Sequence, residues 1–134
     1  MIEFKGDFGA HVLDRLEHDK VIWLTTVAHS GTPEPNPVWF YWNGKEILIY
    51  SQAKSLKLRN IPVHPKVSIN FEGGGDDVIV ITGDAKLEPH SPIIDHGYAK
   101  KYADDIKDLG MTTEQFHADY TVAIHIDPTR LRGF

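Results

Sequence analysis

The sequence predicts a small, mainly β protein, an antiparallel β-barrel with peripheral helices, on the basis of three observations. Short runs rich in β-branched and aromatic residues recur between turn residues, a pattern typical of strands. Asn43-Gly44 joins two such runs, and this dipeptide is the strongest short-range signal for a hairpin. The helical patterns lie between hairpins, which favours an antiparallel barrel over a doubly wound parallel sheet.

The N-terminal part of the chain predicts a helix followed by strands. Apolar residues at helical spacing predict an amphipathic helix over Asp7–His18. Val21–Ala28 is β-branched and aromatic, so we expect a buried strand with Trp23 in the core. Val38–Trp42 and Glu46–Tyr50 are the two strands of the first hairpin.

The middle of the chain predicts a short helix and a second hairpin. Ser55–Ile61 has a helical pattern, and we expect Pro62 to end it because proline removes a backbone hydrogen bond. Gly83 marks a β-bulge in the strands that follow. These strands are expected over Lys66–Phe71, Val78–Thr82 and Ala85–Glu88.

The C-terminal part predicts two more helices and a last strand. A long helix should begin at Ser91 and end at Gly110, with a core stripe of Ile94, Tyr98, Tyr102 and Ile106. Thr112–Gln115 has the form of a capping box, which predicts a short helix after it. The last strand is expected over Tyr120–Ile126, with a tail after it.

Size and composition indicate one ordinary globular domain, residues 1–134, with 41% hydrophobic and 25% charged residues. The chain has no cysteine, which excludes a disulfide framework, a zinc ribbon and a thiol nucleophile. We see no signal peptide and no apolar run long enough to span a membrane, so we expect a cytoplasmic protein.

The charge balance argues against nucleic-acid binding. The formal net charge is −5, whereas a nucleic-acid-binding domain needs a basic surface to displace counterions. Trp39 and Trp42 have opposite parity on their strand, so one indole should face the barrel and the other a partner or a ligand.

The positive charges are local and suit a small anionic ligand. Lys54, Lys57 and Arg59 fall within six residues, at the start of the short helix that also contains Ser55. Free backbone N–H groups at a helix start attract phosphate, and nearby cations add charge-assisted hydrogen bonds. From charge pattern alone, a solvated basic helix without a ligand is the favoured interpretation, because short charged helices are common.

The order of several short motifs resembles a known superfamily. They are Gly31-x-Pro33, the strand Pro37–Phe40, Ser55-x-Lys57-x-x-Asn60, His64–Ser68, Gly83-x-Ala85 and Ile126-x-Pro128-x-Arg130. In this order they resemble the pyridoxamine-phosphate-oxidase-like superfamily, and most closely its deazaflavin-dependent (coenzyme F420) reductases. The resemblance covers essentially the whole chain and implies a six-stranded antiparallel split β-barrel of the FMN-binding type.

The resemblance also implies a cofactor site. The Pro37–Trp39 strand would lie along the flavin-like ring, and Ser51 and Gln52 would face the ribityl or phosphate part. The basic cluster would bind the anionic tail, at the place where the oxidases grip a phosphate. The implied cofactor-binding residues are Pro37, Val38, Trp39, Ser51, Gln52, Lys54, Ser55, Lys57, Arg59 and Asn60.

Two departures from the oxidases shape the expected function. Leu56 stands where the oxidases have a phosphate-binding arginine, and their C-terminal substrate motif is matched only by Arg130-Leu131. We therefore expect no pyridoxamine phosphate oxidation. The expected activity is hydride transfer from reduced coenzyme F420 to an organic small molecule. An FMN-dependent oxidoreductase and a non-catalytic flavin or deazaflavin carrier are the alternatives. The resemblance implies a homodimer with the cofactor at the subunit interface.

Other chemistry is not expected from the sequence. Because the cofactor supplies the hydride, we expect no indispensable acid or base from the protein. Gly73-Gly74-Gly75 lacks the Gly-Lys-Ser/Thr that completes a P-loop. We expect no metal site, because ligand spacing is absent from the candidate sets His90, Asp95 and His96, and His117, Asp119 and His125.

Overall fold

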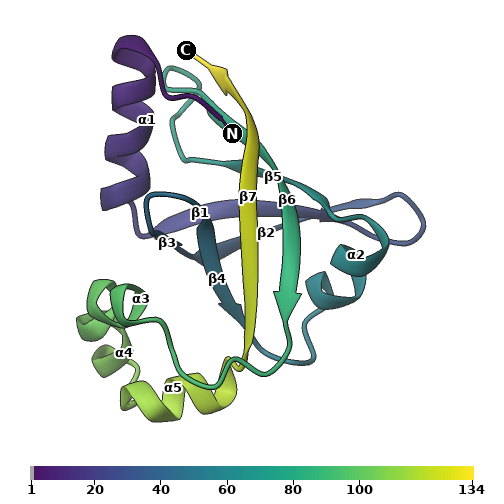
Figure 1. Cartoon of the computed structure of the whole chain (residues 1–134), viewed down its shortest axis with the longest axis vertical. Coiled ribbons are helices and arrows are strands. Elements are labelled where there is room, and N and C mark those ends of the chain that lie inside the picture. Colours follow the sequence, from purple (N-terminus) through teal and green to yellow (C-terminus); the bar gives the residue numbers. More distant parts are fainter. Residues whose placement is uncertain (1) are drawn as a thin grey trace.

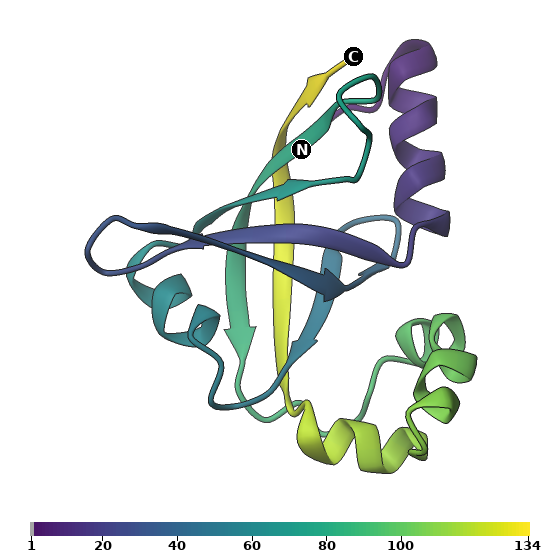
Figure 2. The ribbon, with the colours of Figure 1, turned by 180° about the vertical axis from the view of Figure 1, so that it is seen from behind.

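The computed structural model describes residues 2–134 and contains one curled, antiparallel sheet with helices at its ends and side (Figures 1 and 2). The seven strands of this sheet follow the order β2-β1-β5-β6-β7-β4-β3. The strands are β1 (Val21–Val27), β2 (Pro33–Trp39), β3 (Tyr41–Trp42), β4 (Ile47–Ser51), β5 (Lys66–Asn70), β6 (Ile79–Glu88) and β7 (Val122–Gly133). The mainly β class with peripheral helices is therefore confirmed.

The sheet has seven strands where the resemblance implies six, because Tyr41–Trp42 forms the separate short strand β3. The run expected over Val38–Trp42 breaks at Phe40. Before the break, β2 pairs with β1, and after it, β3 pairs with β4. The two runs around Gly83 form the single strand β6, and the expected bulge lies between Thr82 and Gly83. The expected tail is also wrong, because β7 continues to Gly133 by pairing with β6.

Hairpin chemistry places the turns as expected. In the turn between β3 and β4, Gly44 has φ of +92°, a conformation that glycine adopts without strain. Asn43 Oδ1 accepts the N–H groups of Lys45 and Glu46 at 2.9 and 2.8 Å, which closes the turn. The second hairpin joins β5 to β6 across the Gly-rich residues 71–78.

The helices are α1 (Gly6–His18), α2 (Lys57–Val63), α3 (His96–Lys101), α4 (Ala103–Asp108) and α5 (Thr113–Asp119). Pro62 lies inside α2 and, contrary to our expectation, does not end it. The helix ends one residue later, at Val63, so the hydrogen bond that proline cannot make is lost only in its last turn. The long helix expected from Ser91 to Gly110 begins only at His96, after the cap Asp95, and it is divided into two at Tyr102, where the backbone has φ −106° and ψ 15°. The capping box of α5 is confirmed, with Thr112 and Gln115 exchanging hydrogen bonds.

Two apolar clusters hold the fold together. The first fills the barrel with mostly aliphatic residues from β1, β4, β5, β6 and β7 and from α1 and α2, and Ile22, Ile49 and Ile124 in it are fully buried. The second is aromatic and joins β4 and β7 to α3, α4 and α5. Figures 1 and 2 show this helical segment as a unit at one end of the sheet, on the opposite end from α1.

The tryptophans divide between these clusters and the outer face. Trp42 packs against the barrel cluster and Trp39 against the aromatic cluster, so the expected opposite orientation is confirmed. Trp23 is not in the core, because Ile22 and Leu24 occupy the inward positions of β1. Its indole Nε1 donates to Glu72 at 2.6 Å instead.

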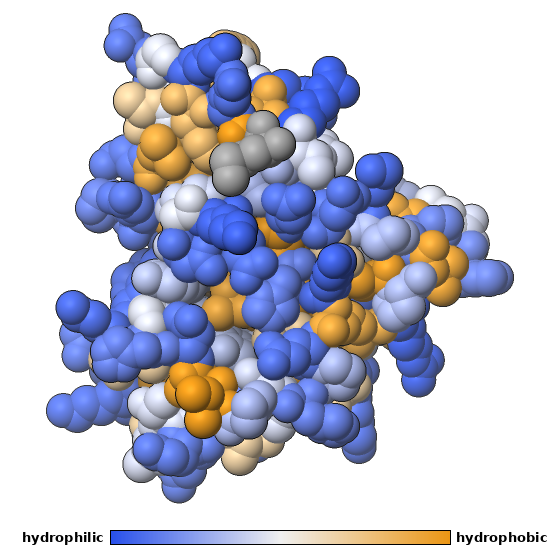
Figure 3. All heavy atoms as spheres, viewed as in Figure 1, coloured by the Kyte–Doolittle hydropathy of each residue, from blue (hydrophilic) through white to orange (hydrophobic). Residues whose placement is uncertain are grey.

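The face of the molecule seen in Figure 3 is mostly hydrophilic, with hydrophobic side chains in small separate groups. Among residues 2–134, no helix is long and apolar enough to cross a membrane.

Candidate functional site

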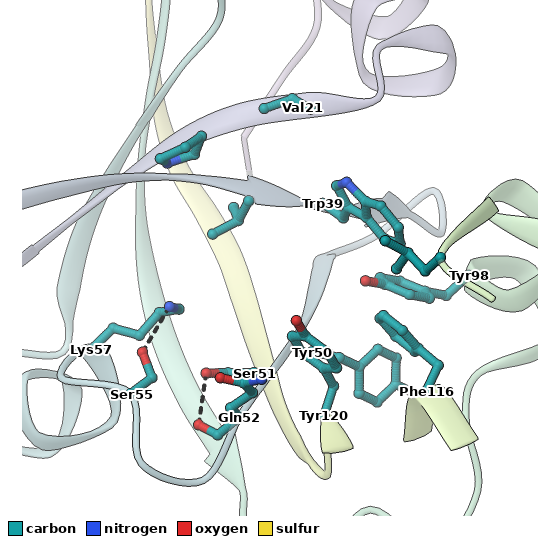
Figure 4. Close-up of a pocket in the computed structure, with 13 residues that line it drawn as sticks. Val21, Trp39, Tyr50, Ser51, Gln52, Ser55, Lys57, Tyr98, Phe116 and Tyr120 are labelled. Atoms are coloured by element: carbon teal, nitrogen blue, oxygen red, sulfur yellow. Dashed lines mark hydrogen bonds between the residues drawn. The ribbon is translucent and has the colours of Figure 1, made fainter. Parts of the chain in front are cut away.

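A pocket of about 450 Å³ lies between the barrel and the helical segment (Figure 4). It is open along one side of β2 and β4, beside the start of α2. Among the ten residues predicted to bind the cofactor, seven line it: Pro37, Val38, Trp39, Ser51, Gln52, Ser55 and Lys57. Two stretches far apart in the sequence thus meet at one site.

The α2 end of the pocket is polar. Lys57 Nζ donates to Ser55 Oγ at 2.8 Å, and Ser51 Oγ donates to the Gln52 carbonyl at 3.1 Å. Figure 4 shows these four side chains gathered on one side of the pocket. Together they offer an ammonium, two hydroxyls and an amide to a ligand.

Lys57 carries the charge of the pocket. Among the described residues that line it, no other side chain is charged at neutral pH. Burial lowers the pKa of the Lys57 ammonium, and no neighbouring carboxylate offsets that effect. An ammonium that has lost part of its water without gaining a counter-charge favours a bound anion.

The opposite end of the pocket is aromatic. Phe116 stacks on Trp39 with ring centroids 5.7 Å apart, and Tyr120 stacks on Phe116 at 4.5 Å. The interplanar angles are 15° and 11°, so the three rings form nearly parallel layers. Tyr98 and Leu109 complete this wall. An uncharged wall of this kind suits a flat, apolar ring.

Tyr50 lies between the two ends of the pocket, as Figure 4 shows. Its hydroxyl oxygen accepts the backbone N–H of Asp95 at 2.7 Å. Burial raises the pKa of this phenol, so the hydroxyl keeps its proton at neutral pH. The ring meets Tyr98 edge to face at 4.7 Å and so links β4 to α3.

The other three predicted residues do not line the pocket. Lys54 and Arg59 are exposed beside it. Asn60 is buried, and its Nδ2 donates to Thr26 Oγ1 at 2.9 Å and to Glu34 Oε1 at 2.7 Å. The Asn60 amide therefore fastens α2 to the β1–β2 hairpin.

Sequence reasoning missed the other lining residues, which are Val21, Tyr50, Tyr98, Leu109, Phe116 and Tyr120. Tyr98 was assigned to a core stripe, and Tyr120 to the start of a strand. The available signal was the group of aromatic residues Tyr98, Tyr102, Phe116 and Tyr120 in one part of the chain.

The histidines proposed and rejected as metal ligands have other partners. His117 Nε2 contacts the Ser91 carbonyl at 2.8 Å. His125 lies between Glu46 and Glu88 at 2.7 and 3.0 Å. Within the part of the chain that the structure describes, no group of three metal-ligating side chains converges.

Comparison with known proteins adds a family and a fold. The family described as pyridoxamine 5'-phosphate oxidase matches residues 8–133. General stress protein 26 of Bacillus subtilis (strain 168) is 30% identical over 99 residues, which are 71% of this chain and 70% of that protein.

Two solved structures have the same fold. General stress protein 26 from Bacillus anthracis str. Sterne has a TM-score of 0.69 at 18% identity, covering 91% of this chain and 89% of that one. A protein named F420 reductase has a TM-score of 0.67 at 23% identity, covering 89% of this chain and 94% of that one. The expected split-barrel fold is thereby confirmed.

Proposed function

Since the chain belongs to the pyridoxamine 5'-phosphate oxidase family, we propose that it is an oxidoreductase that transfers a hydride from reduced coenzyme F420 to an organic acceptor. One observation carries this proposal. The pocket combines the half-buried ammonium of Lys57 with an aromatic wall around Trp39, and these suit the two ends of a flavin-like molecule.

The polar end would hold the phosphate. Lys57 Nζ uses one of its three N–H donors on Ser55, which leaves donors for a phosphate oxygen. A bound phosphate would also replace the water that Lys57 has lost, and its charge would raise the lowered pKa of the ammonium. The residues present therefore fit an anionic group.

The aromatic end would hold the ring and an acceptor. When bound, the reduced deazaflavin supplies the hydride. Pro37 and Val38 offer apolar contacts along β2, and Trp39 closes that side. The layered rings exclude water from the space between them and β4, and Tyr50 holds a hydroxyl proton at its edge.

The choice of coenzyme F420 over FMN rests on the residues around α2. Leu56 is 58% exposed where the oxidases have an arginine, so one phosphate donor of the FMN site is replaced by an apolar side chain. Lys54 and Arg59 remain exposed beside the pocket, where they suit a longer anionic tail. The structural similarity to a protein named F420 reductase agrees with this choice.

FMN is the second candidate, because the matching family is that of pyridoxamine 5'-phosphate oxidase. FMN would use the same Lys57 and Ser55 for its phosphate. A carrier without turnover is the third possibility, and it differs from an enzyme only in failing to transfer a hydride.

We also propose a homodimer with the cofactor at the interface. The outward side of β1 carries Val21, Trp23 and Val27, none of which is fully buried. Apolar residues on the outer face of a sheet are covered in many proteins by a second copy. The pocket adjoins this face through Val21, so a partner subunit there would reach the ligand.

The proposal is tested by titrating the purified protein with coenzyme F420 and, separately, with FMN. Binding is followed by ligand absorbance and by tryptophan fluorescence, which should fall because Trp39 lies in the pocket wall. We expect a colourless protein from a host without coenzyme F420, and saturable binding of that cofactor. A yellow preparation with stoichiometric FMN would overturn the choice of cofactor, and binding of neither would overturn the function.

A further inference from the structure

The break between β2 and β3 leaves one peptide segment outside the sheet ladder. Phe40 lies at this break and is fully buried, so its N–H and carbonyl need partners that are not water. Both partners come from the helical segment, from Lys101 and Tyr102. A point in the barrel is therefore held by residues some sixty positions later in the chain.

The hydrogen bonds at this point can be assigned to individual donors and acceptors. Tyr102 Oη accepts the N–H of Phe40 at 2.8 Å and lies 2.6 Å from the Lys20 carbonyl and 2.9 Å from the Phe40 carbonyl. A phenol has one proton to donate, so Tyr102 Oη donates its hydrogen bond to the nearer carbonyl, that of Lys20. The Phe40 carbonyl then accepts a hydrogen bond from Lys101 Nζ at 2.8 Å.

The ring of Tyr102 acts on the pocket in a different way. It stacks face to face on Trp39, with centroids 4.7 Å apart and an interplanar angle of 2°. Trp39 immediately precedes Phe40, so Tyr102 fixes both the indole and the peptide that follows it. Tyr102 itself is fully buried and does not line the pocket.

The break between α3 and α4 occurs at this same residue. The non-helical backbone at Tyr102 separates Lys101 from Ala103, and the two adjacent side chains, Lys101 and Tyr102, bond to the carbonyl and the N–H of the same residue, Phe40. Lys101 Nζ also lies 3.7 Å from the Phe40 ring centroid, in a cation–π contact. The residues at the interruption of the helix thus hold the backbone of Phe40.

We propose that Tyr102 is a positioning residue for the ring-binding wall, acting through Trp39, an inference that rests on the function proposed above. The phenol anchors the β2–β3 break to the start of β1, and the ring sets the plane of the indole. A displacement of about 1 Å in a binding wall can cost on the order of a hundredfold in rate. Tyr102→Phe, which keeps the ring, should lower cofactor affinity or hydride-transfer rate by roughly tenfold or more.

A double-mutant cycle separates positioning from general loss of stability. Tyr102→Phe, Trp39→Phe and the double variant are titrated with coenzyme F420, and binding is followed by ligand absorbance. If Tyr102 acts through Trp39, the effect of Tyr102→Phe should largely disappear in the Trp39→Phe background. Equal effects in both backgrounds would overturn the proposal, as would unchanged binding and turnover in folded Tyr102→Phe.

Two variants serve as controls. Tyr41→Phe removes another phenol at the edge of the aromatic cluster, and it should leave affinity unchanged because Tyr41 neither lines the pocket nor stacks on Trp39 as Tyr102 does. Ile69→Val lowers stability from inside the barrel and should also leave affinity unchanged. A loss of affinity in Ile69→Val would mean that stability alone controls binding, which contradicts positioning.

Two further results keep the test decisive. If Tyr102→Phe does not fold, Lys101→Met takes its place in the double-mutant cycle, because this variant removes the donor to the Phe40 carbonyl. If the wild-type protein binds neither coenzyme F420 nor FMN, the proposed function fails first. If it binds and Tyr102 has no coupling to Trp39, only the positioning role fails.

Discussion

Replacing Lys57 with alanine tests the polar end of the pocket most directly. Its ammonium is half-buried, donates to Ser55 Oγ at 2.8 Å and has no carboxylate that offsets its burial. A phosphate would therefore gain a charge-assisted hydrogen bond, worth about 1.5–3 kcal/mol. Losing it in Lys57→Ala should weaken cofactor binding by roughly 10- to 150-fold. Lys57→Arg should retain part of the affinity, because arginine keeps the charge with a different donor geometry.

Stability should change in the opposite direction from affinity. The sequence alone suggested a solvated lysine whose removal has little effect, but burial lowers the pKa of this ammonium. A charge that has lost water without gaining a counter-charge destabilises the free protein. Lys57→Met, which keeps the apolar stem, should therefore melt at the same temperature as wild type or higher. Such a gain beside lost binding is typical of residues kept for function.

The pH dependence of binding follows from the same lowered pKa. An anion bound next to Lys57 would raise the pKa of the Lys57 ammonium. The free protein would therefore lose this proton at a lower pH than the complex does. Cofactor affinity should consequently decrease as pH rises from neutral toward the ordinary lysine pKa of about 10.4. In Lys57→Met this decrease should be absent.

The assay is a cofactor titration of each folded variant beside a thermal melt, with Lys54→Ala as the matched control. Lys54 carries the same charge three residues earlier, yet it is exposed and does not line the pocket. Because Lys54 would contact only the exposed anionic tail, its removal should cost clearly less affinity than the removal of Lys57, since solvent and salt screen an exposed charge. Equal losses in both variants would indicate a long-range field. Unchanged affinity in Lys57→Ala would refute the site.

Three further predictions concern assembly, pH and catalysis. Sedimentation at micromolar concentration should give about twice the 15.1 kDa monomer mass, and Val21→Lys should shift it toward the monomer. Burial opposes the charge of His125, but hydrogen bonds to Glu46 and Glu88 raise its pKa. The stability that His125→Gln removes, up to about 1 kcal/mol, should thus be present below the ordinary histidine pKa of about 6.5 and be lost in thermal melts as pH rises through the raised pKa. Alanine at His29 or His64 should leave single-turnover rates within about tenfold, and a larger loss would reveal a proton donor.

Local signals predicted the turns and caps, because each depends on a few adjacent residues. The Asn43-Gly44 hairpin, the bulge at Gly83 and the capping box at Thr112 are confirmed. Long-range packing decided what the sequence did not show. The helix expected from Ser91 to Gly110 is interrupted at Tyr102, whose phenol is committed to the buried peptide of Phe40.

The residues after Ile126 were predicted to form a tail outside the last strand. This tail is a strand in the structure, since β6 offers it a complete partner and shifts register at the bulge between Thr82 and Gly83. Because β6 and β7 lie far apart in the sequence, their pairing leaves no pattern in the local sequence. The same limit explains why Trp23 was placed in the core, when the inward positions belong to its neighbours.

The two ends of the pocket differed in how visible they were in the sequence. The polar end comes from one short segment, in which Ser51, Gln52, Ser55 and Lys57 line the pocket, so a motif and a charge cluster predicted it. The aromatic end is assembled from β2, β4 and the helical segment, and no short motif spans them. Ring size and hydroxyl position at Phe116 or Tyr120 can therefore change without altering the motif that we propose binds an anion. It follows that relatives with the same anion-binding motif can differ in the acceptor they admit, and that acceptor choice has to be sought in the helical segment.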